Sequence, residues 1–345
     1  KALEDIEKGK GIPKEMLLDT IEAALKSAYK RDFGSAGNVT VEIDKNNGDV
    51  EVYSEKEVVE DVENEQEEIS LEDAKEIKSK YEVVDLIEVD VTPSNFGRIA
   101  AQTAKQVVIQ RIREAERDIL YEEFANREGD ILTVIIQREH KSNVIVDLGK
   151  TEAILIPPEQ IAKESYHPGD RIKVYIVEVT ETTKAPNILV SRTHPGLLKR
   201  LFELEVPEIH DGVVEIKSVA REAGFRSKIA VHSNNEDVDS VGACVGPKGS
   251  RVRAIVDELN GEKVDIVEWS ENIEEFISNA LSPAEVISVE SNEEESVARV
   301  IVPDYQLSLA IGKQGQNARL AAKLTGWKID IKSQSQVEEE GTDLF

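Results

Sequence analysis

The chain has 345 residues, enough for about two to four domains. Hydrophobic residues make up 40% of it, so packed cores are expected, and the net charge of −27 argues against a nucleic-acid-binding surface that covers the whole chain. The single cysteine, Cys244, excludes an internal disulfide and a cysteine-rich zinc site, and no apolar run is long enough to span a membrane, so the cytoplasm is the expected location.

The negative charge is concentrated at the two ends of the chain. Residues 1–128 hold 32 acidic and 18 basic residues, and residues 333–345 hold four acidic residues and no basic one. The densest stretch, 55–90, has 15 acids against 4 bases. Such a run is most often a solvated face, and the alternative is a surface that repels nucleic acid and meets a basic protein.

The first 90 residues alternate between helical and strand patterns. Pro13 opens a helix that runs to Phe33, with Leu17, Ile21, Leu25 and Ala28 on one face. The elements expected next are strands over 38–44 and 49–62 joined by Asn46-Asn47-Gly48, a helix over 70–81 that begins at a capping-box-like Ser70 and Asp73, and a strand over 83–91. Together they predict a compact α+β domain.

A long helix follows. Residues 97–127 contain no proline and no internal glycine, which predicts one helix of roughly 45 Å. Its expected apolar stripe consists of Ala104, Val108, Ile112, Ala115 and Ile119. The helix is interpreted as an arm between domains, and the alternative is a helix that caps its own domain.

Five short strands are expected from residue 129 to about 200, over 131–140, 143–149, 151–157, 171–181 and 187–193. Five strands in so short a stretch suit a small closed barrel of the OB type. Tyr166, His167 and Tyr175 are its candidates for stacking on bases, although His167 is equally a plain turn residue before Pro168.

The remainder of the chain contains an internal repeat of helix, two strands, two helices and a strand. Gly246 and Gly249 of the first copy correspond to Gly312 and Gly315 of the second at an offset of 66, as Arg253 corresponds to Arg319. A Gly-x-x-Gly turn between two helices lets a nucleic-acid backbone approach closely, and the following helix points free N–H groups at it. One such turn is more often a simple helix connection, whereas two in the same position of a repeat favour phosphate binding.

The candidate RNA-binding residues lie in and just after these turns. They are Gly246, Pro247, Lys248, Gly249, Arg251 and Arg253 in the first copy, and Gly312, Lys313, Gln314, Gly315, Arg319 and Lys323 in the second. Val241, Val245, Leu307 and Ile311 are expected to line grooves for unstacked bases. The repeat resembles the KH domain in its bacterial α-β-β-α-α-β order, which implies a clamp on single-stranded RNA.

The whole chain is similar to the NusA family of bacterial transcription factors, through stretches such as "EVPEIHDGVVEIKSVAREAG", "VGACVGPKGSRV" and "VIVPDYQLSLAIGKQGQNARLAAKLTGWKIDI". The resemblance implies a multidomain α+β fold, namely an N-terminal RNA polymerase-binding domain with its long helix (1–128), an S1-type OB barrel (129–200), tandem KH domains (201–270 and 271–333) and an acidic tail (334–345). It implies a monomer without cofactor or metal. The implied partners are RNA polymerase, nascent single-stranded RNA and other Nus-type elongation factors. The implied role is in pausing, termination and antitermination.

Two other classes of function were weighed. KH and S1 modules also occur on a phosphorolytic exonuclease, but its large catalytic domains have no counterpart in the first 128 residues. The sequence has no phosphate-binding Walker loop, and its five histidines are isolated from one another, so no catalytic residue is expected. A ribosome-associated or general RNA-binding protein without polymerase contact remains the alternative.

Overall fold

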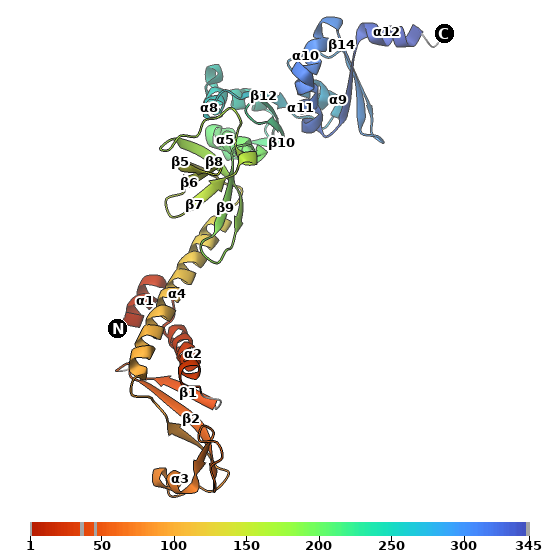
Figure 1. Ribbon diagram of the computed structural model, residues 1–345. Helices are drawn as coiled ribbons and strands as arrows, with labels where there is room; N and C mark the ends of the chain where they lie inside the picture. Colours follow the sequence, from red (N-terminus) through yellow and green to blue (C-terminus); the bar gives the residue numbers. More distant parts are fainter. Residues whose placement is uncertain (1, 35–37, 45–46, 343–345) are drawn as a thin grey trace. The chain divides into compact units, whose positions relative to one another are not determined.

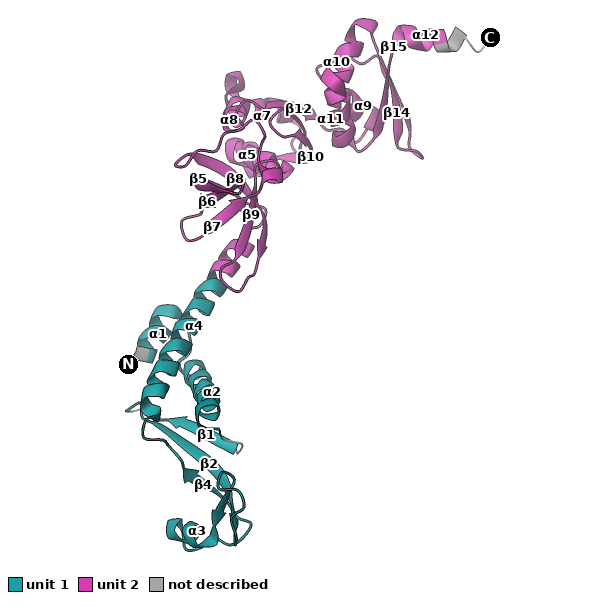
Figure 2. Cartoon of the chain, in the orientation of Figure 1, with its two compact units in different colours: residues 1–119 teal, residues 120–345 magenta. Residues whose placement is uncertain are grey.

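The protein is described here by a computed structural model that covers residues 2–34, 38–44 and 47–342. The chain divides into two compact units, residues 1–119 (unit 1) and residues 120–345 (unit 2), shown in different colours in Figure 2. Among the described residues, no helix combines the length and the apolar character that crossing a membrane requires.

Unit 1 is a four-stranded sheet with helices (Figure 1). Its elements are α1 (Ala2–Lys10), α2 (Lys14–Phe33), β1 (Asn38–Ile43), β2 (Val50–Val59), β3 (Glu68–Ser70), α3 (Leu71–Ile77), β4 (Leu86–Asp90) and the first part of α4 (Phe96–Ala125). Strand β2 is central, because it pairs antiparallel with β1 and β4 and parallel with β3. The expected turn residue Asn46 lies outside the described residues.

The core of unit 1 forms where α2 and α4 pack on the sheet. The predicted face of α2 is buried, and Ile21 and Leu25 join Val52 and Phe96 in one apolar cluster. Ser70 caps α3 as expected, since its hydroxyl oxygen accepts the Asp73 N–H at 3.1 Å. Helix α1 was not predicted, because its short stretch has one glycine, five charged residues and little apolar periodicity.

Helix α4 covers nearly the predicted range, but its apolar stripe is not continuous. In unit 1, Phe96 and Ala100 are buried and Ala104 and Val108 pack beside them. In unit 2, which begins at Leu120, Phe124 enters the core of the barrel. Ile119 belongs to neither core and is 55% exposed, so the prediction that it continues the stripe is wrong.

All five predicted barrel strands are present in unit 2. They are β5 (Ile131–His140), β6 (Asn143–Asp147), β7 (Glu152–Leu155), β8 (Arg171–Thr180) and β9 (Asn187–Ser191), with a turn of 3₁₀ helix, η1 (Pro157–Glu159), after β7. They close in the order β5-β6-β7-β9-β8. Alternate residues point inward, among them Val134, Val146, Val174 and Ile188, which are almost completely buried.

The first repeat consists of α5 (Pro195–Glu205), α6 (Pro207–His210), β10 (Val214–Glu222), β11 (Arg226–Ser233), α7 (Ser240–Val245), η2 (Pro247–Gly249), α8 (Ser250–Glu258) and β12 (Lys263–Glu268). Strand β11 pairs antiparallel with β10 and parallel with β12. Helix α5 buries Leu197, Leu201 and Phe202 against this sheet. The predicted domain boundary at residue 200 therefore falls inside α5, and we propose that the first repeat begins before it.

The second repeat has the same sheet order. Its elements are α9 (Ile273–Ala280), β13 (Ser288–Asn292), β14 (Val297–Val302), η3 (Asp304–Gln306), α10 (Leu307–Ile311), η4 (Lys313–Gly315), α11 (Gln316–Thr325) and β15 (Lys328–Ser333). Strand β14 pairs antiparallel with β13 and parallel with β15. The predicted acidic tail continues as helix α12 (Gln334–Thr342), whose Ser335 hydroxyl donates to Asp304 at 2.7 Å. Residues 343–345 lie outside the described chain.

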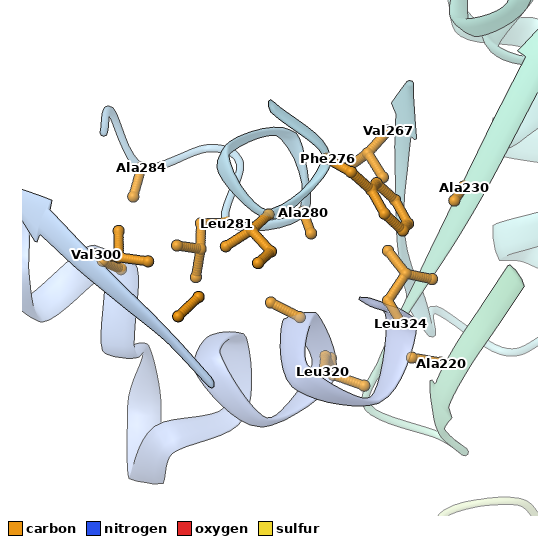
Figure 3. Packing of buried hydrophobic residues seen from close by; sticks show 14 of the residues in the cluster. Ala220, Ala230, Val267, Phe276, Ala280, Leu281, Ala284, Val300, Leu320 and Leu324 are labelled. Carbon is orange, nitrogen blue, oxygen red and sulfur yellow. The ribbon is translucent and has the colours of Figure 1, made fainter. Parts of the chain in front are cut away.

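The two repeats share one hydrophobic core, shown in Figure 3. Ala220, Ala230 and Val267 of the first sheet face Phe276 on α9 and Leu320 and Leu324 on α11. Strand β11 is buried on both sides, because Ile229 and Val231 point into the first repeat's own core. Lys228, completely buried, donates to the Ser282 carbonyl at 2.7 Å and to Asp265 at 3.1 Å.

Replacement of Leu320 by alanine should test this shared core. Because Leu320 is fully buried, Leu320→Ala should lower the free energy of unfolding by about 2–5 kcal/mol. The exposed Leu309 is a matched control, and Leu309→Ala should cost less than about 1 kcal/mol. Urea unfolding can be followed by tryptophan fluorescence, since Trp269 and Trp327 both pack on this core. An equal loss of unfolding free energy in the two variants would contradict the assignment of Leu320 to the shared core.

Candidate nucleic-acid interface

The two glycine turns have the same backbone conformation. In the first loop (Gly246–Gly249), φ is 73° at Gly246, 52° at Lys248 and 73° at Gly249. In the second loop (Gly312–Gly315), the corresponding values are 75°, 53° and 74° at Gly312, Gln314 and Gly315. The last N–H of each loop donates to the carbonyl of its first glycine, at 3.0 and 3.1 Å. The repeat seen in the sequence is thus a repeat of local geometry.

The first and last glycines of each loop are required for different reasons. A Cβ on Gly246 would lie 2.6 Å from Cγ of Arg251, and one on Gly312 would lie 2.8 Å from the backbone nitrogen of Asn317. At Gly249 and Gly315 no atom is closer than 3.9 Å, so the positive φ alone favours glycine there. The open space beside the last glycine leaves room for a ligand backbone.

Each loop leads into a helix whose first turn has no side-chain cap. Helix α8 follows Gly249 and α11 follows Gly315, and in neither case does a side chain accept the first N–H groups. Such groups, together with the positive end of the helix dipole, bind anions well. Both loops therefore offer the donors that a phosphodiester requires.

Four of the predicted cations are exposed in these loops or on the helices that follow them. Lys248 lies in the first loop and Arg253 on α8, while Lys313 lies in the second loop and Lys323 on α11. In the part of the chain that the structure describes, no hydrogen bond or ion pair engages these four side chains. They remain the candidates for phosphate contacts.

Arg251 and Arg319 are engaged within the protein. Arg251 donates to the Ala243 carbonyl at 2.6 Å and to Glu208 at 2.8 Å, so it joins α8 to the helix before the first loop. Asn317 occupies the equivalent place in the second repeat and donates to the carbonyls of Ala310 and Leu281. Arg319 donates to Glu222 at 2.6 Å and to the Gln314 carbonyl at 3.1 Å. No local pattern in the sequence indicates these hydrogen-bond partners.

The apolar surface predicted beside each loop is only partly available. Val241 and Leu307 pack against the cores of their repeats and are only partly buried, so the prediction that they line grooves stays a prediction. Before the second loop, Leu309 and Ile311 of α10 are exposed, and so is Tyr305 of η3, by 76%. The Tyr305 hydroxyl donates to Glu285 at 3.1 Å, and an exposed aromatic ring suits stacking on an unpaired base.

A buried ionic network joins the barrel to the helix after the first loop. Arg192 is completely buried and donates to Glu164, to the Lys173 carbonyl at 2.8 Å and to Glu258 of α8 at 3.1 Å. Burial alone would lower the pKa of Arg192, but Glu164 and Glu258 raise it, so the guanidinium stays charged. Sequence reasoning missed this network, because its members are up to 94 positions apart.

The predicted stacking residues of the barrel have structural roles instead. The Tyr166 hydroxyl accepts the Ile161 N–H and donates to Glu164, which places the ring inside the network. Tyr175 stacks on His194 with ring centroids 4.5 Å apart and packs on the first repeat. Only His167 is exposed, at a turn where it faces Asp170. Tyr166 and Tyr175 are therefore not available for base stacking.

Over residues 2–34, 38–44 and 47–342, no group of three or more histidine, cysteine, aspartate and glutamate side chains is arranged to hold a metal ion. Cys244 is buried beside the first loop, and burial raises the pKa of its thiol to about 12.

Family models match the chain from end to end. They are the NusA N-terminal domain (residues 1–118), the S1 RNA binding domain (126–191), the NusA-like first KH domain (192–269) and the NusA-like second KH domain (273–339). Each match coincides with one of the folded parts described above.

Curated relatives agree with these matches over almost the full length. The chain is 64% identical to the transcription termination/antitermination protein NusA of Halalkalibacterium halodurans, covering 99% of this chain and 89% of that protein. It is 62% identical to the protein of the same name from Bacillus subtilis, covering 99% and 92%. A solution structure of the N-terminal domain of the B. subtilis protein is 54% identical and covers 34% of this chain and 94% of that one, with a TM-score of 0.31.

The different roles of the two arginines of α8 can be separated by mutation. Arg251→Ala removes two hydrogen bonds of a charged group, and should lower the free energy of unfolding by about 1–2 kcal/mol. No described residue forms a hydrogen bond or ion pair with Arg253, so Arg253→Ala should change the free energy of unfolding by less than about 0.5 kcal/mol. Urea unfolding followed by tryptophan fluorescence measures both. A larger loss for Arg253→Ala would show that it has a structural partner.

Proposed function

The chain belongs to the NusA family of transcription termination/antitermination proteins, and from this premise we propose that it binds RNA polymerase through unit 1 and nascent single-stranded RNA through unit 2. The observation that carries the RNA part is the pair of loops with one backbone conformation, each with free cations and an uncapped helix. The cytoplasm, where bacterial transcription takes place, is the proposed location.

The proposed mechanism is non-catalytic. The two loops hold phosphates of the emerging strand, while Lys248, Arg253, Lys313 and Lys323 supply positive charge. Holding the strand single-stranded changes how readily a pause or terminator hairpin forms, and this is how the protein would bias pausing, termination and antitermination. A ribosome-associated role is not favoured, because the relatives that match over the full length are named for transcription.

The RNA clamps can be tested by placing a carboxylate at each open glycine. In a Gly249→Asp/Gly315→Asp double variant, each new carboxylate should lie where the phosphate binds, and RNA binding should be lost while the fold is kept. Aspartate tolerates the positive φ better than most residues. Fluorescence anisotropy with a labelled single-stranded RNA measures affinity, and circular dichroism checks folding. Unchanged RNA affinity in the folded variant would refute the assignment of the loops as RNA clamps.

The salt dependence of binding gives an independent check on the same assignment. Among the described residues, four of the predicted cations have no hydrogen bond or ion pair, so binding should release a handful of counterions rather than about ten. A plot of log affinity against log salt should therefore be shallow, and a slope near −10 would contradict this proposal.

The proposal assigns polymerase binding to unit 1 and RNA binding to unit 2, so it predicts where each partner should cross-link. With the full chain, purified bacterial RNA polymerase and single-stranded RNA, polymerase cross-links should fall in residues 2–119 and RNA cross-links in residues 120–342. Mass spectrometry of the cross-linked peptides measures this. RNA cross-links without any to polymerase would move the function toward a general RNA-binding protein.

A further inference from the structure

Glu222, the last residue of β10 in the first repeat, contacts the helix that follows the loop of the second repeat. Its carboxylate accepts a hydrogen bond from Nε of Arg319 at 2.6 Å and another from the amide of Gln316 at 2.8 Å. Both donors lie on α11. The hydrogen bond from Arg319 lowers the pKa of Glu222 against the opposing effect of burial, and Gln316 lowers it further, so the carboxylate is charged at neutral pH.

Arg319 also contacts the second loop, and so connects Glu222 to it. Its Nη1 donates to the Gln314 carbonyl at 3.1 Å and lies 3.9 Å from the position that a Cβ on Gly315 would take. The side chain is 48% exposed, and no described residue accepts a hydrogen bond from Nη2. The guanidinium is thus held at the open side of the loop with donors left for a ligand.

Glu222 is itself held in place by its neighbour in the strand. Arg221 points to the opposite face of β10, where it donates twice to Glu262, at 2.9 Å each, and once to the His194 carbonyl at 2.8 Å. Arg221 and Glu262 are both completely buried. Burial alone would raise the pKa of Glu262, but Arg221, Ser227 and the Gly224 N–H lower it, so this pair stays ionised and fixes the end of the strand.

The first loop has no counterpart of this arrangement. Arg253, which corresponds to Arg319, is exposed and has no recorded partner among the described residues. An unrestrained arginine must lose side-chain entropy when it binds a phosphate, whereas a held one has already lost it. The two loops therefore differ in how well their arginines are prepared for an anion.

We infer that Glu222 is a positioning residue for the second loop, which orients Arg319 for a backbone phosphate of single-stranded RNA. The inference rests on the proposed RNA-clamp function. Since the carboxylate belongs to the first repeat, it also makes the binding strength of the second loop depend on the packing between the repeats. If Glu222 instead competed with phosphate for Arg319, Glu222→Ala would strengthen RNA binding in the experiment below.

The test is a double-mutant cycle on the full chain. Affinity for a labelled mixed-sequence single-stranded RNA, long enough to reach both loops, is measured for the parent chain, Glu222→Ala, Arg319→Ala and the double variant. Glu222→Ala should weaken binding about three- to tenfold when Arg319 is present. With Arg319 removed, the same change should weaken binding much less, because only the hydrogen bond from Gln316 and a negative charge are then lost. A Glu222→Ala/Arg253→Ala pair is the matched control, and its effects should be additive.

A second variant and a second measurement separate orientation from a loss of structure. Glu222→Gln keeps one acceptor oxygen, and its affinity should lie between those of the parent and Glu222→Ala. Without RNA, amide hydrogen exchange at Gln314 to Gln316 should be faster in Glu222→Ala, while exchange in the first loop should not change. Equal or tighter RNA binding by Glu222→Ala in the presence of Arg319 would overturn the inference.

The proposed function and this inference can fail separately. If the Gly249→Asp/Gly315→Asp variant binds RNA as well as the parent chain does, the clamp assignment fails, and the exchange measurement alone decides whether Glu222 holds the second loop. If that variant loses RNA and the cycle shows no coupling between Glu222 and Arg319, the clamps stand and the positioning role is refuted.

Discussion

The packing of α9 and α11 on the first repeat's sheet is the interaction on which the rest of unit 2 depends. Ala220 and Ala230 are small enough to let α11 approach the sheet, and Leu320 and Leu324 fill the space between them. Because α11 begins directly after the second loop, this apolar contact also positions a candidate RNA-binding element. The two repeats are consequently one folding unit, not two modules on a tether.

Most of the architecture could be predicted from the sequence, because its signals are local. Alternating apolar residues identified all five strands of the barrel, and the two glycine turns revealed the repeat. What could not be predicted depends on pairs that are distant in the chain. Arg319 and Glu222 are 97 positions apart and Arg251 and Glu208 are 43 apart, so no spacing rule marks which arginines are already engaged. Helix α1 was missed because its stretch has little apolar periodicity, whereas α5 was missed although Pro195 and the spacing of Leu197 and Leu201 are local helical signals.

The acidic composition and the proposed affinity for RNA are compatible, because they act over different distances. Interactions between exposed charges are largely screened beyond about 10 Å in ordinary salt, so the net charge of −27 acts mainly as a general repulsion. Backbone N–H groups at the start of α8 and α11 act only on contact. Under the proposed function, a polyanion gains little by approaching most of this surface and gains binding energy where its backbone fits a glycine loop. The shape of the loops should therefore discriminate between polyanions more strongly than a basic protein surface would.

The buried Lys228 has a consequence for the geometry of a bound strand. Apolar contacts alone would tolerate small sliding of α9 and α11 across the sheet, but an ammonium group without its partners is costly to bury. Asp265 belongs to the first repeat itself, but the bond to the Ser282 carbonyl crosses to the segment after α9 and forms only when the repeats are aligned as they are here. Under the proposed function, the distance between the two phosphates that the loops would hold is then set by the packing of the repeats. A strand held at both loops would therefore have to span a distance that the protein fixes.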